Sequence, residues 1–212
     1  MNGGVSGATI GHSDIGGYTS VIQKFMGKTI LEYTRSKEVL QRWIEMNTFS
    51  DPIQRSHPSN IPDEQHQIYE DEDTVLFFKK FVEIHVKLGD YKMDRMMEAS
   101  ENGTAFTRAL MLHFPDDKRA RKVNSEFMLG ENILVAPVFK EGAVSRDVYL
   151  PGPAEWKHLW TGEVYQVSEH GLSLSDFAAP IGQPAVFTRD TPAVQMSEIL
   201  ADYYQATGPV FV

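Results

Sequence analysis

The residues best suited to chemistry stand in one octet near the start of the chain, Gly11 to Tyr18. Asp14 follows a run of small and apolar residues (5–10) and precedes two glycines, an order typical of the C-terminal end of a buried strand. Gly16 and Gly17 allow the backbone to turn away sharply after the carboxylate. The active site of a (β/α)8 barrel lies at such strand ends, so the order makes Asp14 a candidate ligand-binding carboxylate.

Arg55 and His57 form a second candidate pair, at the end of a short strand expected over residues 52–57. Because they are two positions apart, their side chains share one face of an extended strand. Hydrogen-bond donors in that place can bind sugar hydroxyls or a carboxylate. Taken alone, the spacing favours a structural arginine and a solvated histidine, and it leaves the binding role open.

His66 stands close to Glu64 and Glu70, which is a conceivable group of metal ligands, but we interpret this segment as a solvated loop. No Gly-Lys-Ser/Thr sequence follows a glycine cluster, which excludes a phosphate-binding P-loop. The chain has no cysteine, which excludes disulfides and thiolate-bound metals. We therefore predict neither a metal nor a cofactor.

The 212-residue chain has an ordinary globular composition, with 42% hydrophobic and 23% charged residues, and a net charge of −9. An acidic surface disfavours nucleic acid and anionic membranes as partners, so an anionic substrate must be held by a local basic site. The sequence shows neither a charged leader with an apolar segment nor an apolar run long enough to span a bilayer. We therefore expect a cytoplasmic protein without membrane contact.

The elements that must position the candidate residues include two helical segments. Apolar residues recur there at three- and four-residue spacing, which predicts helices over residues 34–49 and 74–100, the second interrupted at Leu88-Gly89-Asp90. Asp51-Pro52 ends the first helix, and Gly103 closes the second. Residues 20–33 and 61–73 are expected to be irregular connections.

Strands are expected over residues 105–114 and 132–138. From there the chain consists of short apolar runs separated by Gly, Pro and Asp, which indicates a β-sandwich with strands over 144–150, 156–159, 163–167, 178–181 and 185–188, and a last helix over 193–205. The change of pattern predicts a domain boundary near residues 120–125, with one domain over 1–122 and the other over 123–212.

Several segments of the chain, taken in order, resemble those of glycoside hydrolase family 31, the retaining α-glycosidases. They are Asp14-Ile15-Gly16-Gly17-Tyr18, Arg42-Trp43, Arg55-Ser56-His57, Leu129 to Val138 and Trp160-Thr161-Gly162-Glu163. The resemblance implies an α/β fold, namely the C-terminal part of a (β/α)8 TIM barrel followed by an all-β sandwich domain with a terminal helix. Most α-glucosidases of the family have Phe or Trp where Tyr18 stands. With Arg35-Ser36-Lys37-Glu38, this makes the sequence most similar to the sulfoquinovosidase branch, whose enzymes cleave α-sulfoquinovosides.

The resemblance also gives the candidate residues roles in binding an α-glycoside substrate. The family histidine that corresponds to His57 hydrogen-bonds hydroxyls of the sugar in the −1 subsite, and Arg55 would support the site beside it. Asp14 would line the same subsite. Tyr18 would lie near the sulfonate or another substituent at C6 of the sugar.

Retaining hydrolysis needs two carboxyl groups about 5–5.5 Å apart, one as nucleophile and one as acid/base. In the family both precede the segment that corresponds to Asp14, so we assign no catalytic residue to this chain. We expect the C-terminal portion of an enzyme, inactive alone, with the missing N-terminal part as its partner. The alternatives are an α-glucosidase or α-xylosidase of the same family, and a non-catalytic sugar-binding fragment or subunit.

Overall fold

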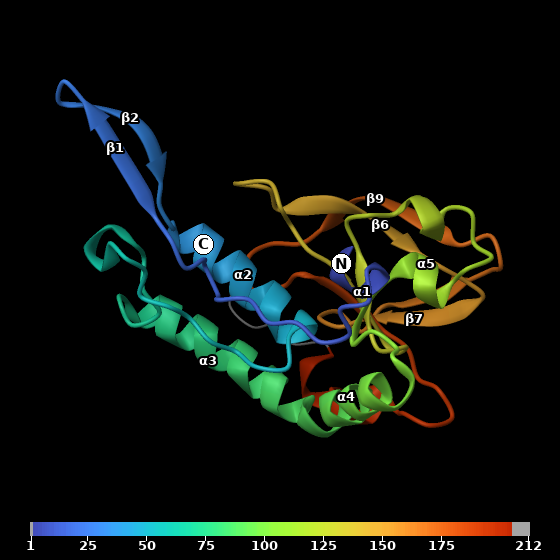
Figure 1. Ribbon diagram of the computed structural model, residues 1–212. Coiled ribbons are helices and arrows are strands. Elements are labelled where there is room, and N and C mark those ends of the chain that lie inside the picture. Colours follow the sequence, from blue (N-terminus) through green and yellow to red (C-terminus); the bar gives the residue numbers. More distant parts are fainter. Residues whose placement is uncertain (1, 205–212) are drawn as a thin grey trace.

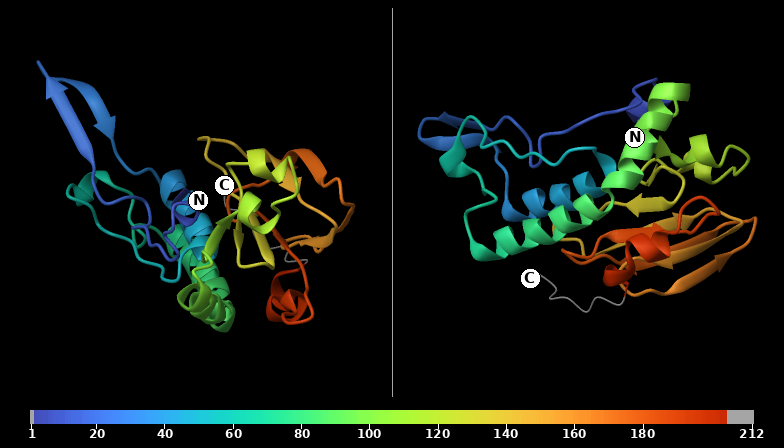
Figure 2. Two further views of the ribbon diagram at one scale, coloured as in Figure 1. Left: turned by 45° about the vertical axis from the view of Figure 1, so that its right-hand side comes forward. Right: turned by 90° about the horizontal axis from the view of Figure 1, so that it is seen from below.

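The computed structural model describes residues 2–204, in which a layer of helices is joined to a β-domain (Figure 1). The long helices are α2 (Lys37–Ser50), α3 (Glu72–Lys87) and α4 (Gly89–Asn102), and a four-residue helix α1 (Asn2–Val5) lies at the start. Helices α2 and α3 pack side by side, as both views of Figure 2 show.

Capping residues set the ends of the long helices. The side chains of Ser36 and Asp71 each accept a hydrogen bond from a backbone N–H in the first turn, of α2 and α3 respectively. Asp51 ends α2, and Gly103 ends α4 in the left-handed conformation, with φ 74°. The expected helices are therefore present, with the break at Leu88 and with bounds shifted by a few residues.

The two expected barrel strands are much shorter than predicted. Helix α1 occupies the start of the segment 5–10, and residues 52–57 form no regular strand. What remains is one parallel bridge between Ile15 and Ser56, with the Ile15 N–H donating to the Arg55 carbonyl at 2.8 Å. A barrel strand is stabilised by a neighbour on each edge, and within residues 2–204 this pair has each other alone as parallel partners.

Residues 20–33 are a β-hairpin, which corrects the expectation of an irregular connection. Strands β1 (Val21–Phe25) and β2 (Lys28–Tyr33) pair antiparallel and project from the body of the molecule (Figures 1 and 2). Met26 and Gly27 form the two-residue turn, both with positive φ, as the common hairpin turns of this length require. The sequence signal is weak because Met26 stands where Asn or Asp is usual, and a bulge breaks the alternation.

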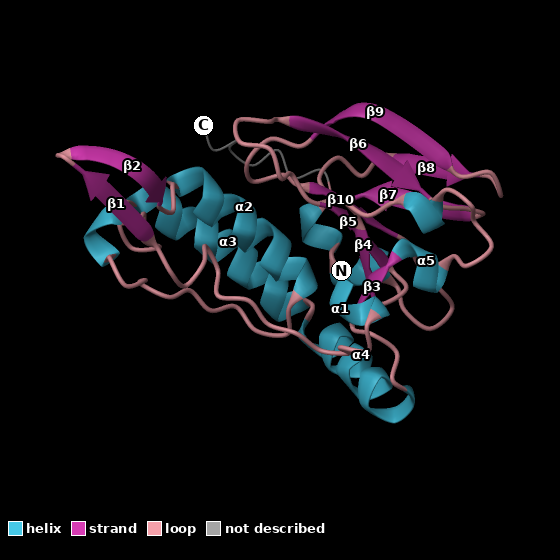
Figure 3. Ribbon diagram, turned by 45° about the horizontal axis from the view of Figure 1, so that its top comes forward, coloured by secondary structure: helices cyan, strands magenta, loops and turns pink. Residues whose placement is uncertain are grey.

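The β-domain is a sandwich of two antiparallel sheets (Figure 3). The larger sheet has the order β3-β4-β5-β10-β7-β8, and β6 and β9 form the smaller one. Their bounds are β3 Thr107–Ala109, β4 Phe127–Leu129, β5 Ile133–Ala136, β6 Ser145–Leu150, β7 Ala154–His158, β8 Val164–Val167, β9 Leu172–Ala178 and β10 Ala185–Thr188. Buried side chains of both sheets meet in one core, among them Leu134, Tyr149, Trp156 and Phe187.

Three expectations for this domain need correction. Only Thr107–Ala109 of the expected strand 105–114 is extended, because helix α5 (Leu110–His113) follows at once. The expected strand 178–181 is absent, because Pro180 has no N–H to donate to a neighbouring strand. The strand in this part of the chain is β9, which ends at Ala178. The expected last helix 193–205 is reduced to α6 (Met196–Ile199) and a 3-10 turn, with residue 205 outside the described residues.

A shared core joins the helices to the larger sheet. Phe77 and Phe81 of α3 lie in one buried cluster with Ile133 and Val135 of β5 and with Trp160. The rings of Phe81 and Trp160 meet edge to face, with centroids 6.2 Å apart. The sheet also begins at Thr107, before the predicted boundary at 122/123, and that boundary stays a prediction.

Polar contacts also join α2 to the β-domain. Arg42 pairs with Glu45 at 3.0 Å, and donates to the carbonyls of Ala143 and Ala179 in the β-domain. Glu45 accepts from the N–H of Gly182 at 2.6 Å. Both side chains are buried, so these bonds fix α2 against the loops of the sandwich.

In the part of the chain that the structure describes, no helix has both the length and the apolar character needed to cross a bilayer.

Candidate functional site

Asp14 and Arg55 meet in a two-point hydrogen bond, although they are far apart in the sequence. The Arg55 Nε and Nη2 atoms donate to Asp14 Oδ1 at 3.0 and 2.7 Å. The guanidinium holds the pKa of the Asp14 carboxyl below its usual value, so this group is ionised at neutral pH. Both Arg55 bonds go to Oδ1, and Oδ2 accepts no hydrogen bond from residues 2–204, which leaves its lone pairs for a ligand.

Tyr18 and His57 form the second contact of the site, with ring centroids 4.3 Å apart. The backbone N–H of Ser59 donates to His57 Nδ1 at 3.0 Å. In the neutral ring this bond places the proton on Nε2, so that Nε2 is a donor. Tyr18 is 57% exposed, which leaves its hydroxyl accessible.

The turn after Asp14 depends on two glycines. Gly16 and Gly17 both have positive φ, at 80° and 88°. A Cβ at Gly16 would lie 2.2 Å from Cδ of Arg35, so a larger residue at this position would also clash.

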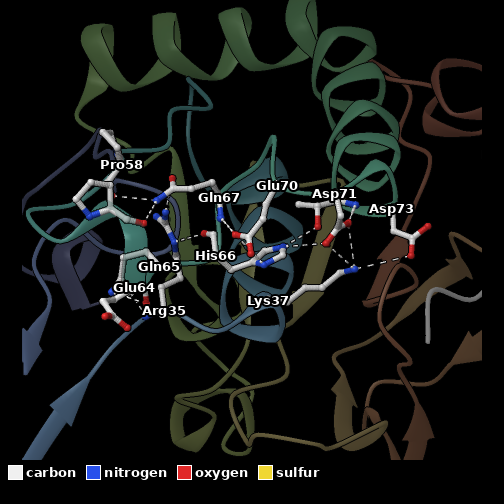
Figure 4. Close-up of polar contacts among 12 residues, drawn as sticks. Arg35, Lys37, Pro58, Glu64, Gln65, His66, Gln67, Glu70, Asp71 and Asp73 are labelled. Atoms are coloured by element: carbon white, nitrogen blue, oxygen red, sulfur yellow. Dashed lines mark hydrogen bonds and ion pairs between the residues drawn. The ribbon is translucent and has the colours of Figure 1, made fainter.

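Arg35 joins the segments that carry the candidate residues. Its guanidinium donates to the carbonyls of Ile15 (3.3 Å), His57 (3.0 Å) and His66 (2.8 Å), and to Gln67 Oε1 (2.9 Å). Figure 4 shows it surrounded by the loop that follows the second strand end. Because Arg35 is 5% exposed, we assign it a positioning role that sequence reasoning missed.

The remainder of that loop is fixed to the helix starts, as Figure 4 shows. Lys37 of α2 pairs with Asp71, the capping residue of α3, at 3.2 Å. His66 faces Glu70 at 3.2 Å and bonds to the Thr74 hydroxyl at 2.8 Å. Within this loop the His66 side chain is 12% exposed and is engaged on both ring nitrogens. Residues 2–204 contain no group of His, Asp and Glu placed to hold a metal ion.

A second support reaches the octet from the end of α2. Asp51 Oδ2 accepts from the N–H and the hydroxyl of Ser13, at 3.0 and 2.9 Å. Trp43 Nε1 also donates to the Ser13 hydroxyl, at 3.0 Å. Lys92 of α4 in turn donates to the carbonyls of Thr48 (2.7 Å) and Asp51 (3.0 Å), where the C-terminal end of α2 has unpaired acceptors.

A cleft of about 260 Å³ lies beside the octet, lined by Gly11, His12 and Ser13 among others. Asp14, Tyr18, Arg55 and His57 are not among its lining residues. The structure thus brings the four predicted residues together in two contacting pairs on an open face, and their binding roles stay predictions.

The fold defines the class of protein to which the chain belongs. Strand ends bridged in parallel inside a layer of helices, followed by a β-sandwich, are the C-terminal part of a TIM barrel with a C-terminal β-domain. The model described as "Glycosyl hydrolases family 31 TIM-barrel domain" matches residues 1–94, and "Glycosyl hydrolase family 31 C-terminal domain" matches residues 103–193. The chain belongs to glycoside hydrolase family 31, which confirms the resemblance read from its motifs.

Known relatives extend this result. A sulfoquinovosidase of Agrobacterium fabrum is 35% identical over 89% of this chain and 26% of its own length. A solved family 31 sulfoquinovosidase from E. rectale, in complex with an aza-sugar inhibitor, superposes with a TM-score of 0.82 at 32% identity, covering 99% of this chain and 29% of that one. An α-xylosidase from a soil metagenome, solved with xylose, has a TM-score of 0.73 at 27% identity, covering 95% and 30%. The chain thus spans about a quarter of the length of the curated relatives it matches.

Proposed function

We propose that this chain is the C-terminal portion of an α-glycosidase that hydrolyses α-sulfoquinovosides with retention. The observation that carries the proposal is the exposed Tyr18 side chain, whose ring packs on His57, in a chain whose 35%-identical relative is a sulfoquinovosidase. A phenol at this place can donate to an anionic group at C6 of the sugar, directly or through water.

The geometry supports a binding role for the other three residues. Asp14 accepts from a sugar hydroxyl through Oδ2, while Arg55 occupies Oδ1 and fixes the carboxylate. His57 donates from Nε2, because Ser59 holds Nδ1 as the acceptor. A donor and an acceptor at adjacent strand ends form the alternating pattern that neighbouring hydroxyls of a pyranose can bridge.

Asp14 is unsuited to the acid step of the reaction. A general acid must be protonated near neutral pH, whereas Arg55 lowers the pKa of Asp14. Among the four candidate residues Asp14 is the one carboxylate, so the chain supplies substrate binding. The nucleophile and the acid/base are then contributed by the preceding part of the barrel.

A chimera tests this proposal. The matching C-terminal segment of the A. fabrum sulfoquinovosidase is replaced by this chain in a single polypeptide, and turnover of 4-nitrophenyl α-sulfoquinovoside, α-glucoside and α-xyloside is compared. We expect the sulfoquinovoside to be hydrolysed with the highest kcat/KM. A folded chimera that prefers the glucoside or the xyloside would overturn the substrate assignment.

The second candidate is an α-xylosidase or α-glucosidase of the same family, which the superposition on the xylose-bound α-xylosidase favours. The same assay distinguishes the two, because an α-xyloside has no C6 substituent for Tyr18 to reach. A non-catalytic sugar-binding subunit would instead leave a folded chimera inactive on all three substrates while it retains affinity for the sugar.

A further inference from the structure

Three polar residues join the chain segments that carry Tyr18 and His57. We call Ser20, Ser59 and Asn60 the clasp. Ser20 stands two positions after Tyr18, where the chain enters β1, and Ser59 and Asn60 stand two and three positions after His57. The clasp therefore connects the two segments whose rings meet in the candidate site.

Asn60 binds both polar groups of the Ser20 backbone. Its Oδ1 accepts from the Ser20 N–H at 2.7 Å, and its Nδ2 donates to the Ser20 carbonyl at 3.0 Å. The Ser59 hydroxyl donates to the same Oδ1 at 3.0 Å and lies 3.0 Å from the Ser20 hydroxyl. Two bonds to the backbone of one residue fix its position and its orientation, as pairing within an antiparallel sheet does.

Ser59 has an unusual backbone conformation, which the clasp holds in place. Its φ is 74°, in the left-handed region that is uncommon for residues other than glycine. The chain turns here directly after the N–H that donates to His57 Nδ1, and the turn brings Asn60 to Ser20. Such conformations persist when the surroundings hold them, and they occur often at functional sites. The bonds that hold the turn therefore also hold the donor to His57.

Other bonds at this loop hold its backbone. Arg35 donates to the His57 carbonyl at 3.0 Å, and Gln67 Nε2 donates to the Pro58 carbonyl at 3.1 Å. Within residues 2–204, the Ser59 N–H is the one hydrogen-bond partner of the His57 ring. The side of the ring that carries the proton therefore depends on the place of Ser59.

We propose that the clasp positions the sugar-binding groups, with Asn60 as its central positioning residue. It keeps the Ser59 N–H on His57 Nδ1, so that His57 Nε2 presents its proton to a sugar hydroxyl. It also fixes the chain after Tyr18, which keeps that ring against His57, with centroids 4.3 Å apart. The inference rests on the proposed function in one respect, that His57 and Tyr18 bind the sugar.

Asn60→Ala in the chimera described above tests the proposal by kinetics. Asn60 is exposed, so the change removes its bonds without opening a buried cavity. A small displacement of binding groups is costly, and kcat/KM for 4-nitrophenyl α-sulfoquinovoside should fall about ten- to a hundredfold. Asn102→Ala is the matched control, because Asn102 Oδ1 also accepts from a backbone N–H and a hydroxyl, both of Thr104 at the end of α4. Equal kcat/KM in the two variants would overturn the proposal.

A spectroscopic measurement separates positioning from a general effect on stability. The ¹⁵N chemical shifts of labelled histidine report which ring nitrogen carries the proton, and the His57 signals are those lost in His57→Gln. We expect the proton on Nε2 in the chimera and in Asn102→Ala, and a mixture of the two neutral forms in Asn60→Ala. His57 signals that are the same in all three proteins would contradict the proposal.

A second substitution tests the turn at Ser59. Glycine adopts positive φ without the steric cost of a side chain, and it keeps the backbone N–H. Adding Ser59→Gly to Asn60→Ala should therefore restore part of kcat/KM and return the proton of His57 toward Nε2. A double variant as impaired as Asn60→Ala in both readouts would show that the clasp does not act through this turn, and would overturn the proposal.

The two readouts distinguish this inference from the proposed function. A folded chimera that hydrolyses no glycoside, but whose His57 signals change with Asn60→Ala, would support the clasp and contradict the proposed activity. An active chimera whose kcat/KM and His57 signals are unchanged by Asn60→Ala would do the reverse.

Discussion

At the scale of single residues, the Asp14–Arg55 pair links the charge of the site to pH. Because Arg55 lowers the pKa of Asp14, the carboxylate stays ionised, and therefore an acceptor, to a lower pH than an aspartate without such a partner. Arg55→Met removes this stabilisation, so the acid limb of kcat/KM in the chimera should move to higher pH. A pH profile of the two proteins checks this, and an unmoved acid limb would separate Asp14 from substrate binding.

Tyr18 is the residue that the substrate assignment singles out. Tyr18→Phe keeps the ring against His57 but removes the hydroxyl. The sulfoquinovoside should lose one hydrogen bond between a donor and its charged group, which is worth about 1.5–3 kcal/mol of transition-state stabilisation, so its kcat/KM should fall. The kcat/KM for the neutral glucoside should stay nearly constant. The measurement is the ratio of kcat/KM for the two substrates in the chimera and its Phe variant. An unchanged ratio would assign Tyr18 to packing.

Asp14 could be singled out from its local sequence, because the two glycines that follow it mark a sharp turn. The local spacing of Arg55 and His57 left their role open, and Tyr18, Arg55 and His57 received binding roles through the family resemblance. Arg35 could not be found in this way. Arg35 falls within the predicted helix 34–49, whereas in the structure it precedes the capping residue of α2 and is buried. Its role depends on contacts with Ile15, His57 and His66, which no local pattern records.

At the scale of elements, Lys92 donates hydrogen bonds to carbonyls at the C-terminal end of α2. Asp51, at the same end of the helix, accepts hydrogen bonds from Ser13 of the octet. Burial lowers the pKa of Lys92 to about 7, compared with 10.5 for the free side chain. Between these values the unfolded chain binds the proton more strongly than the folded one, so this group makes stability rise as pH increases from about 7 to 10.

Lys92→Met tests this arrangement. The substitution leaves the carbonyls of Thr48 and Asp51 without their donor, and we expect a loss of about 1–3 kcal/mol in the free energy of unfolding. Chemical denaturation between pH 7 and 10 should also lose the part of its pH dependence that the lysine causes. A variant with unchanged slope and stability would refute the role of Lys92 as a helix-end donor.

The elements differ in how well their sequences specify them. Helices α2, α3 and α4 carry amphipathic spacing and caps of their own, so their positions could be predicted. The barrel strands at Ile15 and Ser56 depend on neighbours from distant parts of a barrel, and their local sequence does not determine their length. The sequence does not predict the hairpin, because its Met26-Gly27 turn lacks the usual Asn or Asp.

At the scale of the whole molecule, the isolated chain should bind sugar weakly and hydrolyse no glycoside. The four candidate residues bring one carboxylate, whereas retention needs two at close range. Purified chain assayed with 4-nitrophenyl α-sulfoquinovoside and α-glucoside checks this expectation. Turnover that follows the chain through purification and is lost with Asp14→Asn would require a catalytic pair within these residues.

The shared core has a consequence for recombination between members of the family. Trp160 packs on Phe81 across the two family domains, and Arg42 and Glu45 bond to loops at Ala143, Ala179 and Gly182. A crossover placed between the matched regions, at residues 95–102, would separate residues that contact each other in this chain. A chimera that receives the β-domain together with α2 and α3 should therefore fold. A chimera that receives the β-domain without those helices should have a poorly packed interface between the two.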